Sequence, residues 1–270
     1  MYHILRVLLY RLWVVSTFTL FSSAIIFWFY GIFLALSVFT FGISGILYSA
    51  QDLLLYYPND PPDSRVFILQ PSNYKLPYES IKIKSRDGYK IHMFLIKQVN
   101  NSNHVPTMIF FHGNAGNMGQ RLSNVSGGAV AIDLASRSEY KNKIWVLIVE
   151  NTFTSIPDMA KILLKWRCLN WLPMFCHKNK YMSVRKVSGV ACPTLVVCGA
   201  GDALVPPRMA RELALRCGAP LKRLSVLPGG GHDDTWTRPD YYPALLRFLR
   251  DAPPLPPPTA AAPATRVHTV

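Results

Sequence analysis

The sequence predicts an α/β protein with a mostly parallel β-sheet, preceded by an N-terminal transmembrane helix. Two observations carry this prediction. From Leu12 to Ala50, 39 consecutive residues contain no Lys, Arg, Asp or Glu. Further along the chain, short apolar runs that end in glycine-rich loops alternate with segments of helical periodicity. This alternation is typical of parallel strands joined by helices.

The uncharged segment is long enough to cross a bilayer, because about 20 apolar residues in a helix span a hydrocarbon core of about 30 Å. A cleaved signal peptide has an apolar region of only about 7–15 residues, so we expect an anchor instead. The segment can hold one long tilted span or two spans broken near Gly31, and we expect one. The lipid bilayer is therefore the first predicted partner.

The charges that flank this segment predict its orientation. Arg6 and Arg11 precede it, whereas Asp52 follows it. Lys and Arg are enriched on the cytosolic side of membrane proteins, so the N-terminus is expected in the cytosol. With one span the chain is a single-pass type II membrane protein with a signal-anchor, and its C-terminal domain is extracellular or lumenal.

The soluble part is expected to begin after a Pro- and Asp-rich linker at residues 60–64. We assign residues 1–57 to the cytosolic N-terminus and anchor, and residues 58–250 to one domain. Apolar stretches on both sides of Asp87-Gly88 predict a β-hairpin, because this dipeptide accepts the positive φ angles of a tight turn. Residues 251–270 are rich in Pro and Ala without periodicity, which predicts a disordered tail.

Four short apolar runs have the composition of strands that are buried on both faces of a sheet. Segments of helical periodicity lie between and after them. The predicted strands are 107–111, 144–149, 194–198 and 224–227, and the predicted helices are 128–135, 159–166, 207–216 and 241–249. Ligands of parallel α/β sheets bind at the carboxyl ends of the strands, where the glycine-rich loops lie.

Composition excludes several classes of function. The five Cys residues include no C-x-x-C pair, so neither a metal site nor a disulfide scaffold is expected, and no cofactor is predicted. The net charge of +14 suggests nucleic-acid binding. However, the chain has no run of five basic residues and is expected to carry a membrane anchor, so no nucleic-acid partner is expected. Between residues 161 and 186 basic residues alternate with aromatic ones. This mixture suits an anionic membrane surface, a lid over an apolar pocket or ordinary helix packing.

Two residues at the ends of successive predicted strands can form an acid–base pair. Asp202 follows strand 194–198 and His232 follows strand 224–227. A nucleophilic serine needs a histidine to take its proton, and the histidine needs a carboxylate that fixes its tautomer. Glu150, at the end of strand 144–149, is a less suitable acid because Asp202 lies on the strand just before the histidine. The glycine-rich exit of strand 107–111, at Gly113 and Asn114, can supply backbone N–H donors to a developing oxyanion.

The order of oxyanion loop, acid and histidine resembles the α/β-hydrolase family. The resemblance extends from the anchor to about Leu249. The residues that carry it are Phe111-His-Gly-Asn-Ala-Gly-Asn117, Val149-Glu-Asn-Thr-Phe153 with Ser155-Ile-Pro157, Asp202 with Leu204-Val-Pro-Pro207, and Gly231-His232 with Asp234-Thr-Trp236. The resemblance implies an α/β-hydrolase-like sheet and hydrolysis of ester, thioester or related acyl bonds without a metal or cofactor, with an acyl substrate as the second partner. His232 would deprotonate the serine, and Asp202 would orient His232.

The sequence departs from the family where the nucleophile should stand. The family places its serine in a G-x-S-x-G elbow, and no such pentapeptide occurs here. The nearest match centres on Ser126, with Gly127 as the second oxyanion donor. Two helices and two strands normally precede the elbow and need roughly 55–60 residues. Only residues 117–125 separate Gly116 from Ser126, so the sheet is expected to be truncated at its centre and the domain destabilised or partly ordered.

Three readings of this chain therefore remain. The first is a membrane-anchored serine hydrolase with the catalytic residues Ser126, Asp202 and His232. The second is a catalytically inactive, membrane-anchored, hydrolase-like remnant, because the G-x-S-x-G elbow is absent and Ser126 then serves as a turn or helix N-cap residue. The third is a basic adaptor that binds membrane surfaces through residues 161–186. In a lumenal domain the sequon at Asn124 would be a glycosylation site beside the proposed nucleophile.

Overall fold

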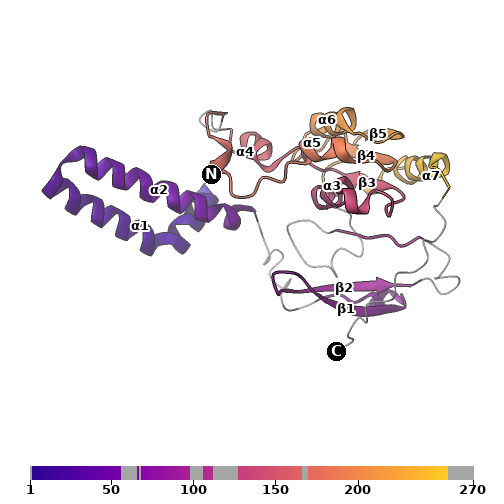
Figure 1. Ribbon diagram of the computed structural model, residues 1–270, viewed down its shortest axis with the longest axis horizontal. Coiled ribbons are helices and arrows are strands. Elements are labelled where there is room, and N and C mark those ends of the chain that lie inside the picture. Colours follow the sequence, from indigo (N-terminus) through magenta and orange to yellow (C-terminus); the bar gives the residue numbers. More distant parts are fainter. Residues whose placement is uncertain are drawn as a thin grey trace. The chain divides into compact units, whose positions relative to one another are not determined.

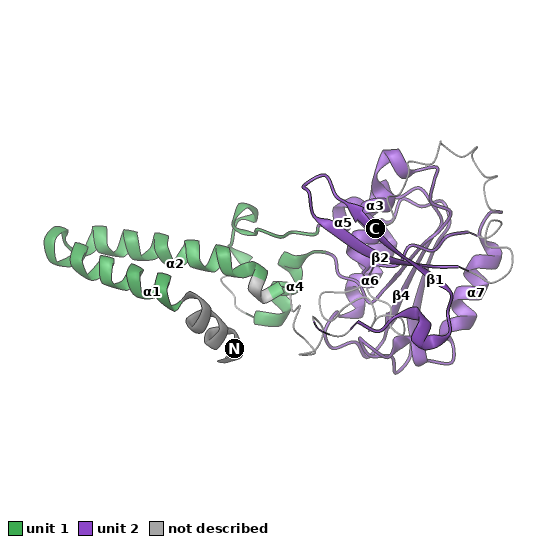
Figure 2. Ribbon diagram, turned by 90° about the horizontal axis from the view of Figure 1, so that it is seen from below, with its two compact units in different colours: residues 1–57, 155–181 green, residues 58–154, 182–270 purple. Residues whose placement is uncertain are grey.

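The structure is a computed structural model that describes residues 2–55, 66, 68–97, 106–111, 127–165 and 170–254. The chain divides into two compact units (Figure 2). Unit 1 contains residues 1–57 and 155–181, and unit 2 contains residues 58–154 and 182–270. Segment 155–181 groups with the N-terminal helices in unit 1. The predicted linker at 60–64 and residues 255–270 of the predicted tail lie outside the described residues.

Unit 1 contains two long apolar helices that lie side by side (Figure 1). Helix α1 spans Tyr2–Tyr30 and helix α2 spans Ile32–Leu55. Gly31, with a φ of 88°, separates the two helices at the position where the sequence allows a break between two spans. Both helices are long and apolar enough to cross a membrane.

Small side chains bring the two helices together. Thr19 packs directly against Gly42, where an added Cβ would collide with the threonine methyl group. Thr19, Ser23, Ala35 and Ala50 are buried, while most large apolar side chains of the described helical residues are exposed. Small residues at the contact and large apolar residues outside are typical of helices that pack within lipid.

Unit 1 also contains helix α4, Ile156–Leu164, and the 3₁₀ turn η6, Met174–Cys176. The side-chain oxygen of Ser155 caps α4 by accepting a hydrogen bond of 3.1 Å from the backbone N–H of Asp158. This cap and the proline at the start of the helix make α4 begin three residues before the predicted start at residue 159.

Unit 2 is built on a parallel three-stranded sheet in the order β3-β4-β5. Strand β3 spans Leu147–Glu150, β4 spans Thr194–Gly199 and β5 spans Lys222–Leu227. All three were predicted, although β3 is shorter than expected. Strand β4 is central and buried along its whole length, which explains why its sequence is continuously apolar.

Helices cover both faces of this sheet. Helices α3, Gly128–Ser136, and α6, Pro207–Arg216, pack on one face, where Val196 and Cys198 of β4 point. Helix α7, Tyr241–Asp251, covers the other face through Phe248, against Leu195 and Val197. The other helical elements among the described residues of unit 2 are helix α5, Ser183–Lys186, and four 3₁₀ turns: η2, Pro71–Tyr74; η4, Ser138–Tyr140; η7, Val187–Gly189; and η8, Thr235–Thr237.

The predicted hairpin is present. Strand β1, Tyr78–Lys84, pairs antiparallel with β2, Lys90–Ile96, and Gly88 in the turn has a φ of 91°. Of the cysteines in the described ranges, Cys176, Cys192, Cys198 and Cys217 are free thiols, and the last three pack in the core.

The predicted strand at 107–111 does not form. These residues belong to no strand, and Met108 and Ile109 are exposed. A strand gains stability only from hydrogen bonds to its neighbours and from burial of its faces. In the sheets of the described residues no strand pairs with this segment, in line with the expectation that the sheet is truncated.

Candidate active site

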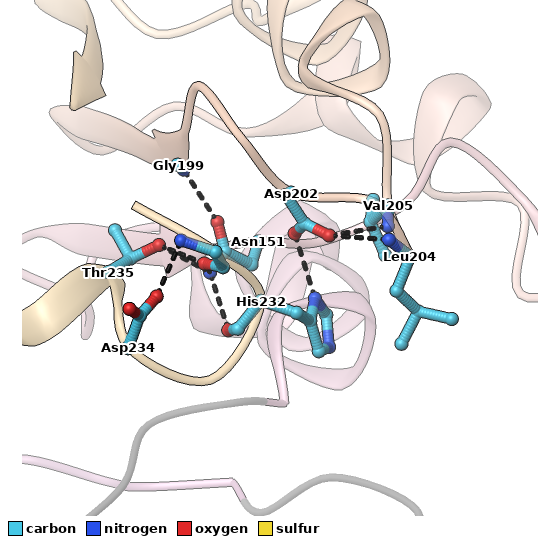
Figure 3. A network of polar contacts seen from close by, with 9 residues as sticks. Asn151, Gly199, Asp202, Leu204, Val205, His232, Asp234 and Thr235 are labelled. Carbon is cyan, nitrogen blue, oxygen red and sulfur yellow. Dashed lines mark hydrogen bonds and ion pairs between the residues drawn. The ribbon is translucent and has the colours of Figure 1, made fainter. Parts of the chain in front are cut away.

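The structure brings Asp202 and His232 together at the carboxyl ends of β4 and β5 (Figure 3). Asp202 Oδ2 lies 2.8 Å from His232 Nδ1. A carboxylate only accepts hydrogen bonds, so His232 Nδ1 carries the proton and the neutral ring presents Nε2 as a free base. The Asp202 side chain is fully buried, whereas 23% of the His232 side chain is exposed, so a reactant can reach the ring.

The Asp202 carboxylate is held by backbone groups as well. Its Oδ1 accepts hydrogen bonds from the N–H groups of Leu204 at 2.9 Å and Val205 at 2.8 Å. These bonds satisfy a buried carboxylate oxygen and fix the direction in which Oδ2 faces His232. The sequence Asp202-x-Leu204-Val205 therefore builds a turn that aims the acid.

The environment of His232 favours its protonated form. Burial disfavours the imidazolium, but the hydrogen bond and charge of Asp202, with smaller contributions from Asp233 and Glu150, outweigh burial and raise the pKa of His232. A base with a raised pKa holds an abstracted proton better than free histidine does. The arrangement can therefore accept a proton at Nε2 and stabilise the resulting positive charge.

Asn151 connects the three strand ends, and the sequence analysis assigned no role to it. Its Nδ2 donates to the backbone oxygens of His232 at 2.7 Å and Gly231 at 3.2 Å, and to Thr235 Oγ1 at 2.9 Å. Its Oδ1 accepts from the N–H of Gly199 at 3.0 Å. Asn151 is buried and has a φ of 42°, which asparagine tolerates better than most residues. The loop that carries His232 is thus fastened to the ends of β3 and β4.

Glu150 lies beside this network in a different bond. Its Oε2 accepts a hydrogen bond of 2.7 Å from the hydroxyl of Tyr241. Burial, partly opposed by that hydrogen bond, raises the pKa of Glu150 to about 7. Glu150 does not contact His232 among the hydrogen bonds and ion pairs of the described residues, so Asp202 is the acid that orients the histidine.

The predicted nucleophile and most of the predicted oxyanion donors cannot be placed. Gly113, Asn114, Asn124 and Ser126 lie outside the described residues. Gly127 is described and precedes the first turn of α3.

The start of α3 packs tightly, and this position requires glycine. A Cβ on Gly127 would collide with the carbonyl oxygen of Phe111, and a Cβ on Gly128 would come within 2.7 Å of Thr152 Cβ. Thr152 follows Asn151 in the chain, so the helix start adjacent to Ser126 contacts the same strand end that holds the His232 loop. Within the described part of the chain no cluster of three or more His, Cys, Asp or Glu could hold a metal ion.

Comparisons with known proteins place this geometry in a wider group. No family model matches the chain. Protein bem46 of Schizosaccharomyces pombe is 27% identical over 77% of this chain and 88% of its own length. The alpha/beta hydrolase domain-containing protein WAV2 of Arabidopsis thaliana is 26% identical over 77% of this chain and 90% of its own length. A relative in Saccharomyces cerevisiae, 24% identical over 75% of this chain and 90% of its own length, is named an uncharacterized membrane protein.

The alignment with bem46 also contains positions at which this chain has no residue. It runs over 268 positions but uses 77% of the 270 residues here, which is about 208, so about 60 aligned positions have no residue in this chain. The two helices and two strands before the elbow need roughly 55–60 residues and nine residues stand there, so the shortfall expected from the sequence is of similar size, about 50 residues.

A solved structure has the same fold. The esterase Pf2001 of Pyrococcus furiosus superposes with a TM-score of 0.51 at 13% identity, over 69% of this chain and 95% of the esterase. At this identity the likeness concerns the fold alone. Together, the parallel sheet with helices on both faces and the superposition on the esterase show the α/β-hydrolase fold, and the similarity to bem46 and WAV2 supports the α/β-hydrolase superfamily.

Proposed function

We propose that the protein is a membrane-anchored serine hydrolase that cleaves ester, thioester or related acyl bonds. The observation that supports this most strongly is the Asp202–His232 pair, with a buried acid, a half-buried base and a 2.8 Å bond between them. An asparagine network fixes the loop on which the base sits. Such preorganisation is what proton transfer in acyl hydrolysis requires.

In the proposed mechanism Ser126 is the nucleophile. His232 Nε2 takes the hydroxyl proton while the serine oxygen attacks the acyl carbonyl carbon, and backbone N–H groups of Gly127 and of the Gly113-Asn114 loop stabilise the oxyanion. The proton then passes from His232 to the leaving alcohol or thiol as the acyl–serine ester forms. Water, deprotonated by His232, cleaves this ester and regenerates the serine. Asp202 keeps the ring oriented and stabilises its positive charge.

One observation favours a second candidate, the inactive membrane-anchored remnant. Residues 107–111, which lead into the proposed oxyanion loop, form no strand and are largely exposed. Among the described residues, the segment that leads into the oxyanion loop is therefore not held in a sheet, and the missing G-x-S-x-G elbow removes the strained turn that exposes a serine.

Hydrolysis by the full chain in detergent micelles separates the two candidates. With a short-chain thioester as substrate, the hydrolase proposal predicts that His232→Ala lowers kcat/KM by about 10³-fold, a typical contribution of general acid–base catalysis. The matched control is His92→Ala, which removes the β2 histidine that contacts Ser80 Oγ and should leave the rate unchanged. Equal rates for wild type and His232→Ala would support the remnant.

We further propose that the anchor is the helical hairpin of α1 and α2. Two antiparallel membrane helices return the chain to the side on which it began, so unit 2 would share the cytosolic side with Arg6 and Arg11. The single-pass type II arrangement predicted from the sequence, with a glycan on Asn124, is the alternative. The hairpin predicts that endoglycosidase treatment of protein from mammalian membranes leaves its gel mobility unchanged. A mobility shift that disappears in Asn124→Gln would establish the lumenal topology instead.

A further inference from the structure

A short apolar turn projects from the surface of unit 1. Residues 170–175, with the sequence Asn-Trp-Leu-Pro-Met-Phe, are all exposed. Trp171 is 88% exposed and Phe175 is 77% exposed. Large apolar side chains that are adjacent and exposed mark a surface that contacts a partner or a membrane. We call residues 170–180 the interfacial turn.

The interfacial turn is bound to the end of helix α2. The Gln51 side chain bridges two backbone groups: its Nε2 donates to the Cys176 oxygen at 2.8 Å, and its Oε1 accepts from the Lys178 N–H at 2.9 Å. Asp52 forms an ion pair with Lys178 Nζ and accepts a hydrogen bond of 2.5 Å from Asn179 Nδ2. Gln51 and Asp52 end the long uncharged segment of the chain, so these four contacts fix the turn at the polar end of a membrane helix.

The surroundings of the turn are basic. Segment 155–181 contains five basic residues and one acidic residue, namely Lys161, Lys165, Arg167, Lys178, Lys180 and Asp158. Lys178 and Lys180 belong to the turn itself, and burial together with the charges of Lys161 and Lys180 lowers the pKa of His177. Exposed aromatic side chains beside lysines are typical of segments that lie in the headgroup region of anionic membranes.

We propose that the interfacial turn lies in the headgroup region of an anionic bilayer, with Trp171 and Phe175 inserted at the boundary of the acyl chains. The proposal rests on the membrane anchoring by α1 and α2 proposed above. The occupant of this surface is lipid and not another protein, because the turn is bound to the polar end of a membrane helix and the bilayer surface lies at that level. The lysines then face the lipid phosphates.

Quenching of tryptophan fluorescence by brominated lipids tests the position of Trp171. The parent is the full chain carrying Trp13→Phe and Trp28→Phe, which removes the described tryptophans of the membrane helices. It is reconstituted into vesicles of phosphatidylcholine and phosphatidylserine, brominated near the headgroup end of the acyl chains. We expect that adding Trp171→Phe removes most of the quenching. The matched control Trp236→Phe, which removes a side chain packed against the core of unit 2, should leave the quenching unchanged.

A second variant tests the connection to α2. Replacing Gln51 and Asp52 by Ala in the same parent removes all four contacts, and we expect weaker quenching of Trp171. The proposal is overturned if Trp171→Phe leaves the quenching of the parent unchanged, or if aqueous iodide quenches Trp171 while brominated lipid does not. Flotation of the protein with vesicles tests the anchoring separately, and hydrolysis tests the proposed enzyme separately.

Discussion

The Asn151 side chain connects the His232 loop to the ends of two strands, so its replacement should strongly destabilise the fold. In Asn151→Asp the Oδ1 acceptor for Gly199 N–H and the tolerance of a positive φ are kept. The donor, however, becomes a carboxylate oxygen that faces the oxygens of Gly231, His232 and Thr235. An isosteric change therefore turns attraction into repulsion at a buried position.

The magnitude follows from counting these bonds. The amide has two hydrogens, so the variant loses about two buried hydrogen bonds, each worth about 1 kcal/mol, and leaves buried acceptors unsatisfied at about 1–3 kcal/mol. We expect Asn151→Asp to lower the free energy of unfolding by about 4 kcal/mol, a large share of the 5–15 kcal/mol typical of a domain. Asn151→Gly loses the same donors and the Gly199 contact without the repulsion, so it should cost about 3 kcal/mol.

Urea denaturation of the full chain in detergent micelles, followed by tryptophan emission, measures these differences. Trp236 reports on the affected loop because it lies four residues after His232 and packs against the core. The matched control is Asn73→Asp, on the surface turn η2 in the same unit. The reasoning would be refuted if Asn151→Asp unfolded within about 0.5 kcal/mol of wild type, the usual range for surface substitutions.

Three further predictions concern neighbouring groups. The pKa of Glu150 is raised from 4.5 to about 7, so between these pH values the folded state retains a proton that the unfolded state loses. The free energy of unfolding should therefore fall by about 3 kcal/mol as the pH rises from 4.5 to 7. Urea midpoints across this range should show this decline in wild type and not in Glu150→Gln. Burial lowers the pKa of His232, but Asp202 raises it by more, so the pKa is raised overall. The acid limb of the pH profile of kcat/KM should therefore have its midpoint above pH 6.5, and the midpoint should move to lower pH in Asp202→Asn. An unmoved midpoint would exclude this pairing from the mechanism. In Gly127→Ala the new Cβ collides with the Phe111 carbonyl oxygen. Thermal unfolding should show that the free energy of unfolding falls by about 1–3 kcal/mol, as is typical of overpacking. The control Gly45→Ala, where a Cβ meets open space, should show little change.

The sequence predicted those features whose causes are local. Helix α6 begins at Pro207 and ends at Arg216, as expected, because a proline at the first position and an amphipathic repeat define it. The pairing of Asp202 with His232 followed from topology, since the ends of adjacent parallel strands meet at one edge.

The features that failed depend on distant partners. Residues 107–111 have the composition of a buried strand, but composition cannot supply the neighbours that a strand needs, and about 60 positions of the alignment with bem46 have no residue in this chain. Mean hydropathy is high on both sides of Gly31, so it could not decide between one continuous span and the two helices α1 and α2 that the structure shows. Asn151 stood in a recognised motif, yet its role depends on His232 and Thr235, more than 80 residues away.

The proposed function requires that the Asp202–His232 pair activates a serine. The most direct measurement is mass spectrometry of the full chain in membranes after reaction with a fluorophosphonate, followed by trypsin. The account predicts a phosphonate adduct on Ser126 within the peptide 122–137, absent in His232→Ala and retained in Ser123→Ala. An unmodified peptide in wild type, under conditions that label other serine hydrolases in the same membranes, would contradict the proposed enzyme and leave the inactive remnant.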